Sequence, residues 1–511
     1  MIKFNNLLKK YKHMKQYRFI LPGLIVILIS LTLPAATGQT IQRTMHLTLD
    51  DVVQIARNQS PQAILSQHRF RASYWQHRSY RAEFLPNLNF RGTLPDFNRS
   101  ITSYTLPDGS DRFIERNIIN TLASVSLNQN IGLTGGQIFM QSELQRIDNL
   151  DLDSATYRTT PINIGFRQSL SGYNAYRWQR EIQPLRFEEA RRSYVSALEN
   201  VSLQAVNLYF NLALAQVNLE IARLNYSNTD TLYRIAEGRY NIGTIPENQL
   251  LQMELSYLNA GTALNEATLD LEVRKFRLRS FLGYNETVDI ELIIDSDVPF
   301  LKPDLNKALT EALSNNPEVI QFERQLIEAE RDVAQARAQR GFNADLFAVY
   351  GLTNSAPVFA DAYKDPQITQ RVQVGIQIPI MDWGLGRGRY RMAQSSQEVV
   401  RTQVEQARID FEQNVFLEVM MFTMQYDQLA IAAKADTIAK KRFDVTRERF
   451  LIGRIEVRDL NDAITEQDIA RRGFISALRN YWTYYYNLRR LTLYDFEGDR
   501  KLTEDFDELV L

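Results

Sequence analysis

Residues 198–222 have the sequence LENVSLQAVNLYFNLALAQVNLEIA, and this stretch decides the fold. Its apolar residues alternate in spacings of three and four, which is the seam of a coiled coil. They are Leu198, Val201, Ala205, Leu208, Leu212, Ala215, Leu219 and Ala222. The surrounding segment 185–237 contains no glycine or proline, and neither does segment 389–452. A helix over the second segment would be about 96 Å long at ~1.5 Å per residue, too long for one globule. We therefore expect long helices that pack side by side.

The chain contains two tandem repeats. One series of identical or similar residues runs at a constant offset of 256, and a second series runs at an offset of 210. The first series pairs Leu49, Val53, Ala56, Pro61, Ile64, Arg81, Ala82 and Asn87 with Leu305, Leu309, Ala312, Pro317, Ile320, Arg337, Ala338 and Asn343, and the second pairs Arg239 to Gly243 with Arg449 to Gly453. The 46 residues by which the offsets differ are extra sequence in the first half. We predict a first structural repeat at 39–300, a second at 301–495 and a C-terminal tail at 496–511.

Residues 1–38 have the features of a secretory signal peptide. Six Lys and Arg residues precede an apolar segment at 19–33, and Ala36-Thr37-Gly38 puts small residues where a signal peptidase cleaves. The alternative is a retained anchor helix, but the 15 residues of the apolar segment are short for a membrane span of about 20. Without this segment the chain has 53 basic and 60 acidic side chains, a net charge of −7. That balance gives no electrostatic case for nucleic-acid binding. No later stretch approaches 18 apolar residues, which excludes a helical inner-membrane transporter.

The segments before the long helices have the alternation of β-strands. Apolar residues alternate with polar or small ones from Val372 to Ile380, and segments 88–94 and 162–166 follow the same pattern. The pattern is typical of a half-buried sheet in a soluble protein, or of a barrel strand with lipid outside and water inside. An exported chain whose strands adjoin such long helices favours the barrel. We predict strands at about 87–170 and 343–381, and long helices at about 172–282 and 385–492.

Residues suited to catalysis or metal binding are scarce. The chain has no cysteine and four histidines, of which His68 and His77 lie nine residues apart, on opposite faces of a helix. The segment Gly384–Gly388 resembles part of a dinucleotide-binding loop, but it lacks the third glycine at the right spacing and a βαβ pattern around it. No motif places two carboxylates across a cleft, as a hydrolase requires. We therefore expect no enzyme activity, no cofactor and no metal site.

In its duplication and order of elements the chain resembles the TolC family of outer-membrane efflux proteins. The motifs that carry the resemblance are the helix starts Ser60-Pro61 and Asn316-Pro317, the strand-to-helix junctions at 170–172 and 380–384, the turns at 239–243 and 449–453, and Phe281-Leu282-Gly283. None of them is specific alone, but together and in this order they cover essentially all of the chain after residue 38.

The resemblance implies a mainly α-helical, homotrimeric channel in the outer membrane of a Gram-negative bacterium. Each protomer would give strands to an outer-membrane β-barrel in contact with lipid, and long antiparallel helices to a periplasmic α-barrel. Substrates would enter from an inner-membrane transporter joined by a periplasmic adaptor, or membrane fusion protein. A sheet in lipid must in any case close to satisfy its edge groups. The alternative from another class is a periplasmic coiled-coil structural or adaptor protein without a pore, which leaves the alternating strands unexplained.

The first half departs from the family pattern of four strands per protomer. Its surplus lies among candidate strands at Ala123–Ile131 and Pro161–Leu170, with a Gly135-Gly136 turn and a further candidate strand at Gln137–Gln145 between them. We predict an additional hairpin or structured insertion near the barrel.

Aromatic residues close after the strands are predicted to lie at the membrane interface. They are Tyr173, Tyr176, Trp178, Trp383 and Tyr390. The alternative role for them is packing in a protein core.

Two turns end the long helices of the two repeats. Gly243-Thr244 and Gly453-Arg454 place a glycine where a helix C-cap needs one. The resemblance implies that these turns are the periplasmic tips that contact the adaptor.

Two aspartates follow the second turn, Asp459 six residues and Asp462 nine residues after Gly453. Residues three apart share a helix face, and the ordinary meaning of such a pair is a solvated acidic surface. The resemblance implies instead that both line the periplasmic aperture, where threefold symmetry would gather six carboxylates that attract cations.

The residues around this aperture depart from the family pattern. Phe450 has no hydroxyl, Ile455 stands at the position of an arginine, and Gln249 stands at the first-half position that matches Asp459. We therefore expect a gate that is latched by other contacts.

Overall fold

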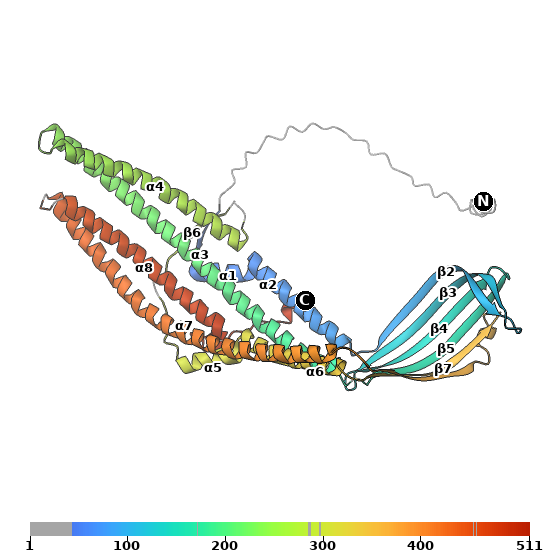
Figure 1. Ribbon diagram of the computed structural model, residues 1–511. Helices are drawn as coiled ribbons and strands as arrows, with labels where there is room; N and C mark the ends of the chain where they lie inside the picture. The colour runs from blue at the N-terminus through green and yellow to red at the C-terminus, as the bar shows by residue number, and fades with distance from the viewer. Residues whose placement is uncertain are drawn as a thin grey trace, which may run out of the picture. The chain divides into compact units, whose positions relative to one another are not determined.

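The computed structural model describes residues 43–170, 172–284, 288–295, 298–452, 454–455 and 457–510. The predicted signal peptide at 1–38 lies outside these residues. The described part combines long helices with a six-stranded sheet at one end of them (Figure 1). The expected class, mainly α-helical with a β-sheet part, is confirmed. Both repeats belong to one compact unit that starts at residue 43, so the boundary between them stays a prediction.

A short helix pair opens each repeat, and the second helix of each pair begins with a capped proline. Ser60 Oγ accepts the N–H of Ala63 at 3.1 Å, and Asn316 Oδ1 accepts the N–H of Glu318 at 2.9 Å. The pairs are α1 (Leu49–Gln59) with α2 (Pro61–Ala82), and α5 (Leu305–Asn315) with α6 (Pro317–Gln339).

The long helices have equal lengths in the two repeats. They are α3 (Ala175–Asn241), α4 (Glu247–Leu282), α7 (Leu385–Leu451) and α8 (Val457–Thr492). Helices α3 and α7 have 67 residues each, about 100 Å at ~1.5 Å per residue, and α4 and α8 have 36 each. They pack as antiparallel neighbours in the order α4, α3, α8, α7 (Figure 1). The prediction of long antiparallel helices is therefore confirmed.

Helix α3 starts ten residues before the segment without glycine and proline, because it continues through Pro184 back to Ala175. A proline inside a helix removes one backbone hydrogen bond and normally breaks or kinks it. Here α2 and α6 pack against α3, and Ile182, two residues before the proline, is only 3 % exposed. Tertiary packing outweighs the local preference.

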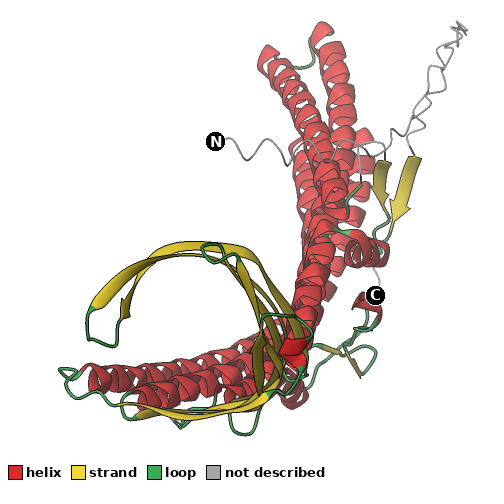
Figure 2. Ribbon diagram, turned by 90° about the vertical axis from the view of Figure 1, so that its right-hand side faces the viewer, coloured by secondary structure: helices red, strands yellow, loops and turns green. Residues whose placement is uncertain are grey.

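Six strands form one antiparallel sheet in the order β2-β3-β4-β5-β7-β8. Figure 2 shows that this sheet curves strongly. The first half supplies four of the strands and the second half two. The strands are β2 (Asn87–Thr105), β3 (Asp111–Ile131), β4 (Gly136–Asn149), β5 (Ser154–Ser169), β7 (Asn343–Ala356) and β8 (Gln367–Gln377). Two smaller sheets pair β1 (Arg43–Leu47) with β6 (Val288–Leu292), and β9 (Tyr494–Asp495) with β10 (Arg500–Lys501).

The main hydrophobic core is built mostly by α1, α3, α7 and α8, and residues of the segment that links the repeats pack against it. Two buried tyrosines bind that linker: Tyr209 OH donates to the carbonyl of Ile293 at 2.6 Å, and Tyr481 OH donates to that of Pro299 at 2.5 Å. Their rings fill the core while their hydroxyls satisfy linker carbonyls. The core thus joins the two repeats.

A buried carboxylate connects three distant parts of the chain. The side chain of Glu199 on α3 is 0 % exposed and lies between Arg57 of α1 and Arg489 of α8. Arg57 Nη1 is 2.5 Å from Glu199 Oε1, and Arg489 Nε is 3.0 Å from Oε2. Arg489 also lies 3.3 Å from Asp495 in β9. Breaking such a pair leaves a buried charge without compensation, so removing one partner costs more than the intact pair contributes.

We predict that Glu199→Ala destabilises the fold by about 3–5 kcal/mol, because two guanidinium groups lose their shared partner. Thermal loss of helical circular dichroism in detergent measures the effect. Glu220→Ala, at an exposed position of the same helix, is the matched control and should leave the melting temperature unchanged. Equal effects of the two substitutions would contradict the assignment.

Candidate functional site

The turn between α3 and α4 ends the helix with a Schellman motif. Gly243 has φ +76°, the left-handed region that favours glycine. Its N–H donates to the carbonyl of Tyr240 at 2.8 Å, and the N–H of Thr244 donates to the carbonyl of Arg239 at 2.9 Å. The Thr244 hydroxyl donates to the same carbonyl at 2.8 Å. The sequence at this turn is thus explained by helix capping.

The turn between α7 and α8 repeats this geometry where it is described. The N–H of Arg454 donates to the carbonyl of Arg449 at 3.0 Å. These two residues match Thr244 and Arg239 of the first turn at the offset of 210, so the same hydrogen bond occurs in both turns. Gly453, which the sequence also assigns to this tip, lies outside the described residues. Contact of either tip with an adaptor stays a prediction.

The two aspartates lie in the first two turns of α8, and both are exposed. Asp462 lines a groove of about 710 Å³ between the α3–α4 hairpin and α8, whereas Asp459 is not among the lining residues. The groove also holds Arg239 and Arg458, which sequence reasoning did not assign to the site. Arg239 belongs to the repeated turn motif, and this repetition was the sequence signal that could have assigned it to the tip. Acidic and basic side chains therefore line one groove near the tips.

Two positions that depart from the family pattern line the same groove. They are Gln249 on α4 and Ile455, two residues before the start of α8. The side chain of Phe450 lies outside the described residues. An amide and an aliphatic side chain thus stand in this groove beside the two arginines.

The first-half aromatic residues lie where the sheet meets the helices. Tyr173 precedes α3, and Tyr176 and Trp178 lie in its first turn. All three are partly buried, and the ring of Tyr176 packs edge-on against Phe84 at 5.4 Å. A position at the membrane interface stays a prediction for them.

The second-half aromatic residues lie at the equivalent junction. Trp383 is 91 % exposed and has φ +53°. Tyr390 lies in the first two turns of α7, and the guanidinium carbon of Arg340 lies over its ring, 4.8 Å from the ring centroid. An exposed indole six residues after β8 is suited to an interfacial anchor, because the ring is apolar and its N–H is polar. This role stays a prediction for Trp383 and Tyr390.

Strand β8 has one apolar and one polar face, and its apolar face continues onto β7. Ala348 stands beside Val372, and Leu346 stands beside Val374. The residues Val372, Val374 and Ile376 are 55–74 % exposed, although all three are apolar. The opposite face of β8 carries Arg371, Gln373 and Gln377. This is the pattern of strands between lipid and a water-filled lumen.

The backbone of the glycine-rich segment at the start of α7 donates hydrogen bonds to the nearby carboxylate of Asp382. Asp382 accepts the N–H of Gly384 with Oδ1 and the N–H of Gly386 with Oδ2, both at 2.9 Å. These two bonds, that of Gly386 first, lower the pKa of Asp382. The amides that a phosphate would need are thus occupied by a helix-capping aspartate.

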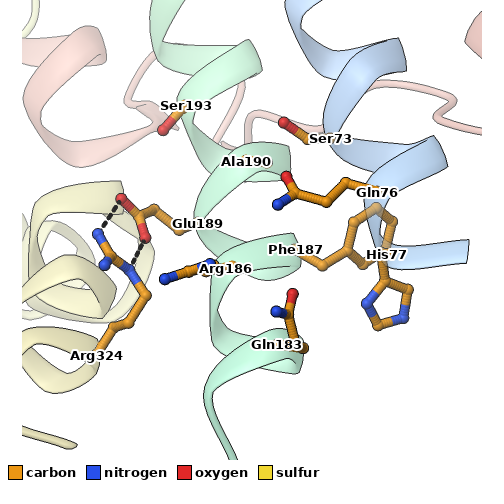
Figure 3. A pocket seen from close by; sticks show the side chains of 10 residues that line it. All are labelled: Ser73, Gln76, His77, Gln183, Arg186, Phe187, Glu189, Ala190, Ser193 and Arg324. Atoms are coloured by element: carbon orange, nitrogen blue, oxygen red, sulfur yellow. Dashed lines mark hydrogen bonds and ion pairs between the residues drawn. The ribbon is translucent and has the colours of Figure 1, made fainter. Parts of the chain in front are cut away.

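A cavity of about 440 Å³ lies between α2, α3 and α6 (Figure 3). His77 stacks on Phe187 at 4.5 Å at one side, and Glu189 binds Arg324 with both oxygens at the other. Burial first, and Arg81 second, lower the pKa of His77. Among the described residues, no three His, Asp or Glu side chains are placed to bind a metal ion. No described helix is both long enough and apolar enough to cross a membrane.

Comparison with solved structures shows the same fold in outer-membrane channels. The Campylobacter jejuni CmeC channel matches with a TM-score of 0.64 and 16 % identity, over 90 % of this chain and 88 % of that one. Vibrio cholerae VceC matches with a TM-score of 0.60 and 13 % identity, over 87 % and 95 %. The open state of Neisseria gonorrhoeae MtrE matches with a TM-score of 0.58 and 14 % identity, over 89 % and 90 %. A search of curated proteins found no significant match.

The family model described as "Outer membrane efflux protein" matches residues 52–284 and 308–492, which include both sets of strands and all four long helices. The repeated helix pairs, the two-faced sheet and the capped hairpins are therefore those of a known family, and the chain belongs to the outer membrane efflux proteins.

Proposed function

We propose that this chain forms the outer-membrane channel of a tripartite efflux or secretion system. The observation that carries the proposal is the union, in one compact unit, of a sheet with an exposed apolar face and helices about 100 Å long. The sheet would lie in the outer membrane and the helices would extend into the periplasm. The family consists of channel proteins, so we expect no catalysis.

Three copies of the chain would close the channel, as the family resemblance implies. Helices α4 and α7 lie at the two edges of the layer of long helices, and both expose apolar stripes. Exposed apolar stripes of this length require a partner surface. The residues are Leu251, Leu255, Leu258, Leu269 and Phe276 on α4, and Leu417, Met424, Ile431, Ile438 and Val445 at a strict seven-residue spacing on α7. Packing α7 of one copy on α4 of the next would bury both stripes.

The partners would be a periplasmic adaptor and an inner-membrane transporter. The tips lie at the far end of the long helices from the sheet, where a channel that spans the outer membrane meets proteins of the inner membrane (Figure 1). The alternative, a coiled-coil adaptor without a pore, has no support from the family match, and it leaves the two-faced sheet without a role.

Conductance of the purified protein in planar lipid bilayers tests the channel directly. We expect detergent-stable trimers in the outer-membrane fraction that insert and conduct in steps. Full release of the protein by osmotic shock, with no conductance, would favour the adaptor.

For the tips we predict that Thr244→Pro weakens coupling to the adaptor and leaves the trimer intact. Proline removes the N–H and the hydroxyl that both donate to Arg239, so the capped turn cannot form as described. Crosslinking to the adaptor in cells measures the coupling. Thr244→Ser keeps both donors and serves as the control, and Arg454→Pro should repeat the effect at the second tip. Loss of the trimer itself would show that the turns serve folding alone.

For the aperture we predict cation preference, with block by multivalent cations, that depends on Asp459 and Asp462. The double variant Asp459→Ala, Asp462→Ala should lower cation selectivity and abolish the block in bilayers, because six carboxylates leave the lumen of the trimer. The pair Asp459→Glu, Asp462→Glu keeps the charge and should behave as the unchanged protein. Unaltered selectivity and block in the alanine variant would show that both residues only form a solvated acidic helix surface.

A further inference from the structure

The first half of the chain contributes a complete extra hairpin to the sheet. Strand β2 begins at Asn87, which the offset of 256 matches to Asn343, the start of β7. Strand β8 ends at Gln377, which the offset of 210 matches to Arg167, near the end of β5. The additional strands between these shared ends are therefore β3, which runs toward the helical end of the sheet, and β4, which runs away from it. Four strands per protomer, the number that the family resemblance implies, would leave both without a place.

The extra strands pair along their length and reach the helical end of the sheet. Strands β3 and β4 pair without a register shift from Ile118 opposite Asn149 to Ile131 opposite Gly136. Their turn is bound to the start of α3, because Asn174 Nδ2 donates to the carbonyls of Gly132 and Leu133, each at 3.0 Å. A hairpin that only capped the outer end of a barrel would not extend down to this junction.

The strand registers align the apolar residues of all six strands on one face. The aligned residues are Leu88 and Phe90 of β2, Val125 and Leu127 of β3, Ile138 and Met140 of β4, Ile164 and Phe166 of β5, Leu346 of β7, and Val374 and Ile376 of β8. On the extra strands Val125 is 41 % and Ile138 is 45 % exposed, close to the 49 % of Ile164 on β5. Their opposite face carries Ser126, Gln137 and Gln141. The extra strands therefore have the lipid side and the water side of their neighbours.

A charged pair marks the outer limit of the apolar face on β4. Arg146 Nη2 lies 2.7 Å from Asp148, on the face of β4 that begins with Ile138. Ile138 and Arg146 are eight residues apart, about 27 Å at ~3.4 Å per residue in a strand. At a tilt of ~40° this length rises about 21 Å across the membrane, so β4 spans most of the ~25 Å apolar band of an outer-membrane barrel.

We propose that three copies of this chain close a barrel of eighteen strands, with β8 of each copy paired to β2 of the next. This inference rests on the proposed trimeric channel and adds the composition of its barrel. Strands β2 and β8 are the two edges of the described sheet, and each has one strand neighbour. Strand β2 leaves the helical end and β8 returns to it, so the closing pair is antiparallel like every other pair in the sheet.

The internal repeat also sets the register of the closing pair. Within one copy, β5 at the end of the first repeat's strands pairs with β7 at the start of the second, and Arg167 stands opposite Phe347. Arg167 corresponds to Gln377 at the offset of 210, and Phe347 corresponds to Arg91 at the offset of 256. If the closing pair has the same register, Gln377 of one copy stands opposite Arg91 of the next. Both residues lie on the polar face of the sheet, so the transferred register keeps lipid and water sides in line.

Eighteen strands widen the outer part of the channel. With strands ~4.8 Å apart and tilted by ~40°, they close at a backbone diameter of about 36 Å, against about 24 Å for twelve strands. The barrel would then pass any cargo that the periplasmic aperture admits, and selection by size would rest with the aperture.

The chain has no cysteine, so each added thiol is a unique reporter. The variant Arg91→Cys, Gln377→Cys should form a covalent trimer on oxidation in outer membranes, seen by denaturing electrophoresis without reductant. The control Arg91→Cys, Arg371→Cys moves one thiol six residues along β8, about 20 Å at ~3.4 Å per residue, and should stay monomeric after denaturation. Absence of the crosslink in intact trimers would overturn the proposed closure.

Labelling with a membrane-impermeant maleimide tests whether the extra hairpin belongs to the barrel. Single cysteines at Ser126 and Gln141 should react, and those at Val125 and Met140 should react only after denaturation. Gln373→Cys and Val374→Cys on β8 give the reference alternation. Intact conducting trimers in which Val125→Cys and Met140→Cys react as fast as their neighbours would place the hairpin outside the membrane and overturn the inference, while the channel stands. Absence of trimers and of conductance in the unmodified protein would overturn the proposed function itself.

Discussion

Unpaired backbone groups at the edges of the sheet are the constraint on which the rest of the structure depends. Strands β2 and β8 each present one row of N–H and C=O groups that no described strand of the same copy satisfies. In lipid each such group costs several kcal/mol, so the sheet is stable there only when it closes. Closure through copies of the chain then imposes the same symmetry on the helices, whose edge members α4 and α7 carry the matching apolar stripes.

Packing is uneven along α3, and buried residues become sparse toward the tip. Most buried residues of α3 lie between Tyr194 and Ala222, around Glu199 and the linker between the repeats, and only Ala236 is buried closer to the tip. Local stability follows the density of buried contacts, so the tips are the part of the helical layer that opens at the lowest free-energy cost. The groove with Arg239, Arg458 and Asp462 lies in this part.

Much of the fold and part of the site could be predicted from local sequence. The spacing of Leu198 to Ala222 predicts α3, the alternation after Val372 predicts β8, and the glycine of Gly243 predicts the end of a helix; each of these patterns depends on residues within one or two turns of chain. The helix expected from about residue 172 does begin at Ala175, but its continuity through Pro184 depends on packing against α2 and α6, which no local pattern specifies. The basic residues of the groove were missed, since nothing near Arg458 in the sequence indicates that α3 lies opposite.

The sequence by itself determined the kinds of element, their lengths and their repetition, because periodicity, glycine and proline act on the backbone within a few residues. It also determined the family, since the motifs of both repeats and their order can be recognised in the sequence without the structure. Only the tertiary structure decided that β3 and β4 join the same sheet as β8, and that Glu199 meets Arg57 and Arg489. Those contacts join residues up to 290 positions apart, and their free energy exists only once the chain brings the partners together.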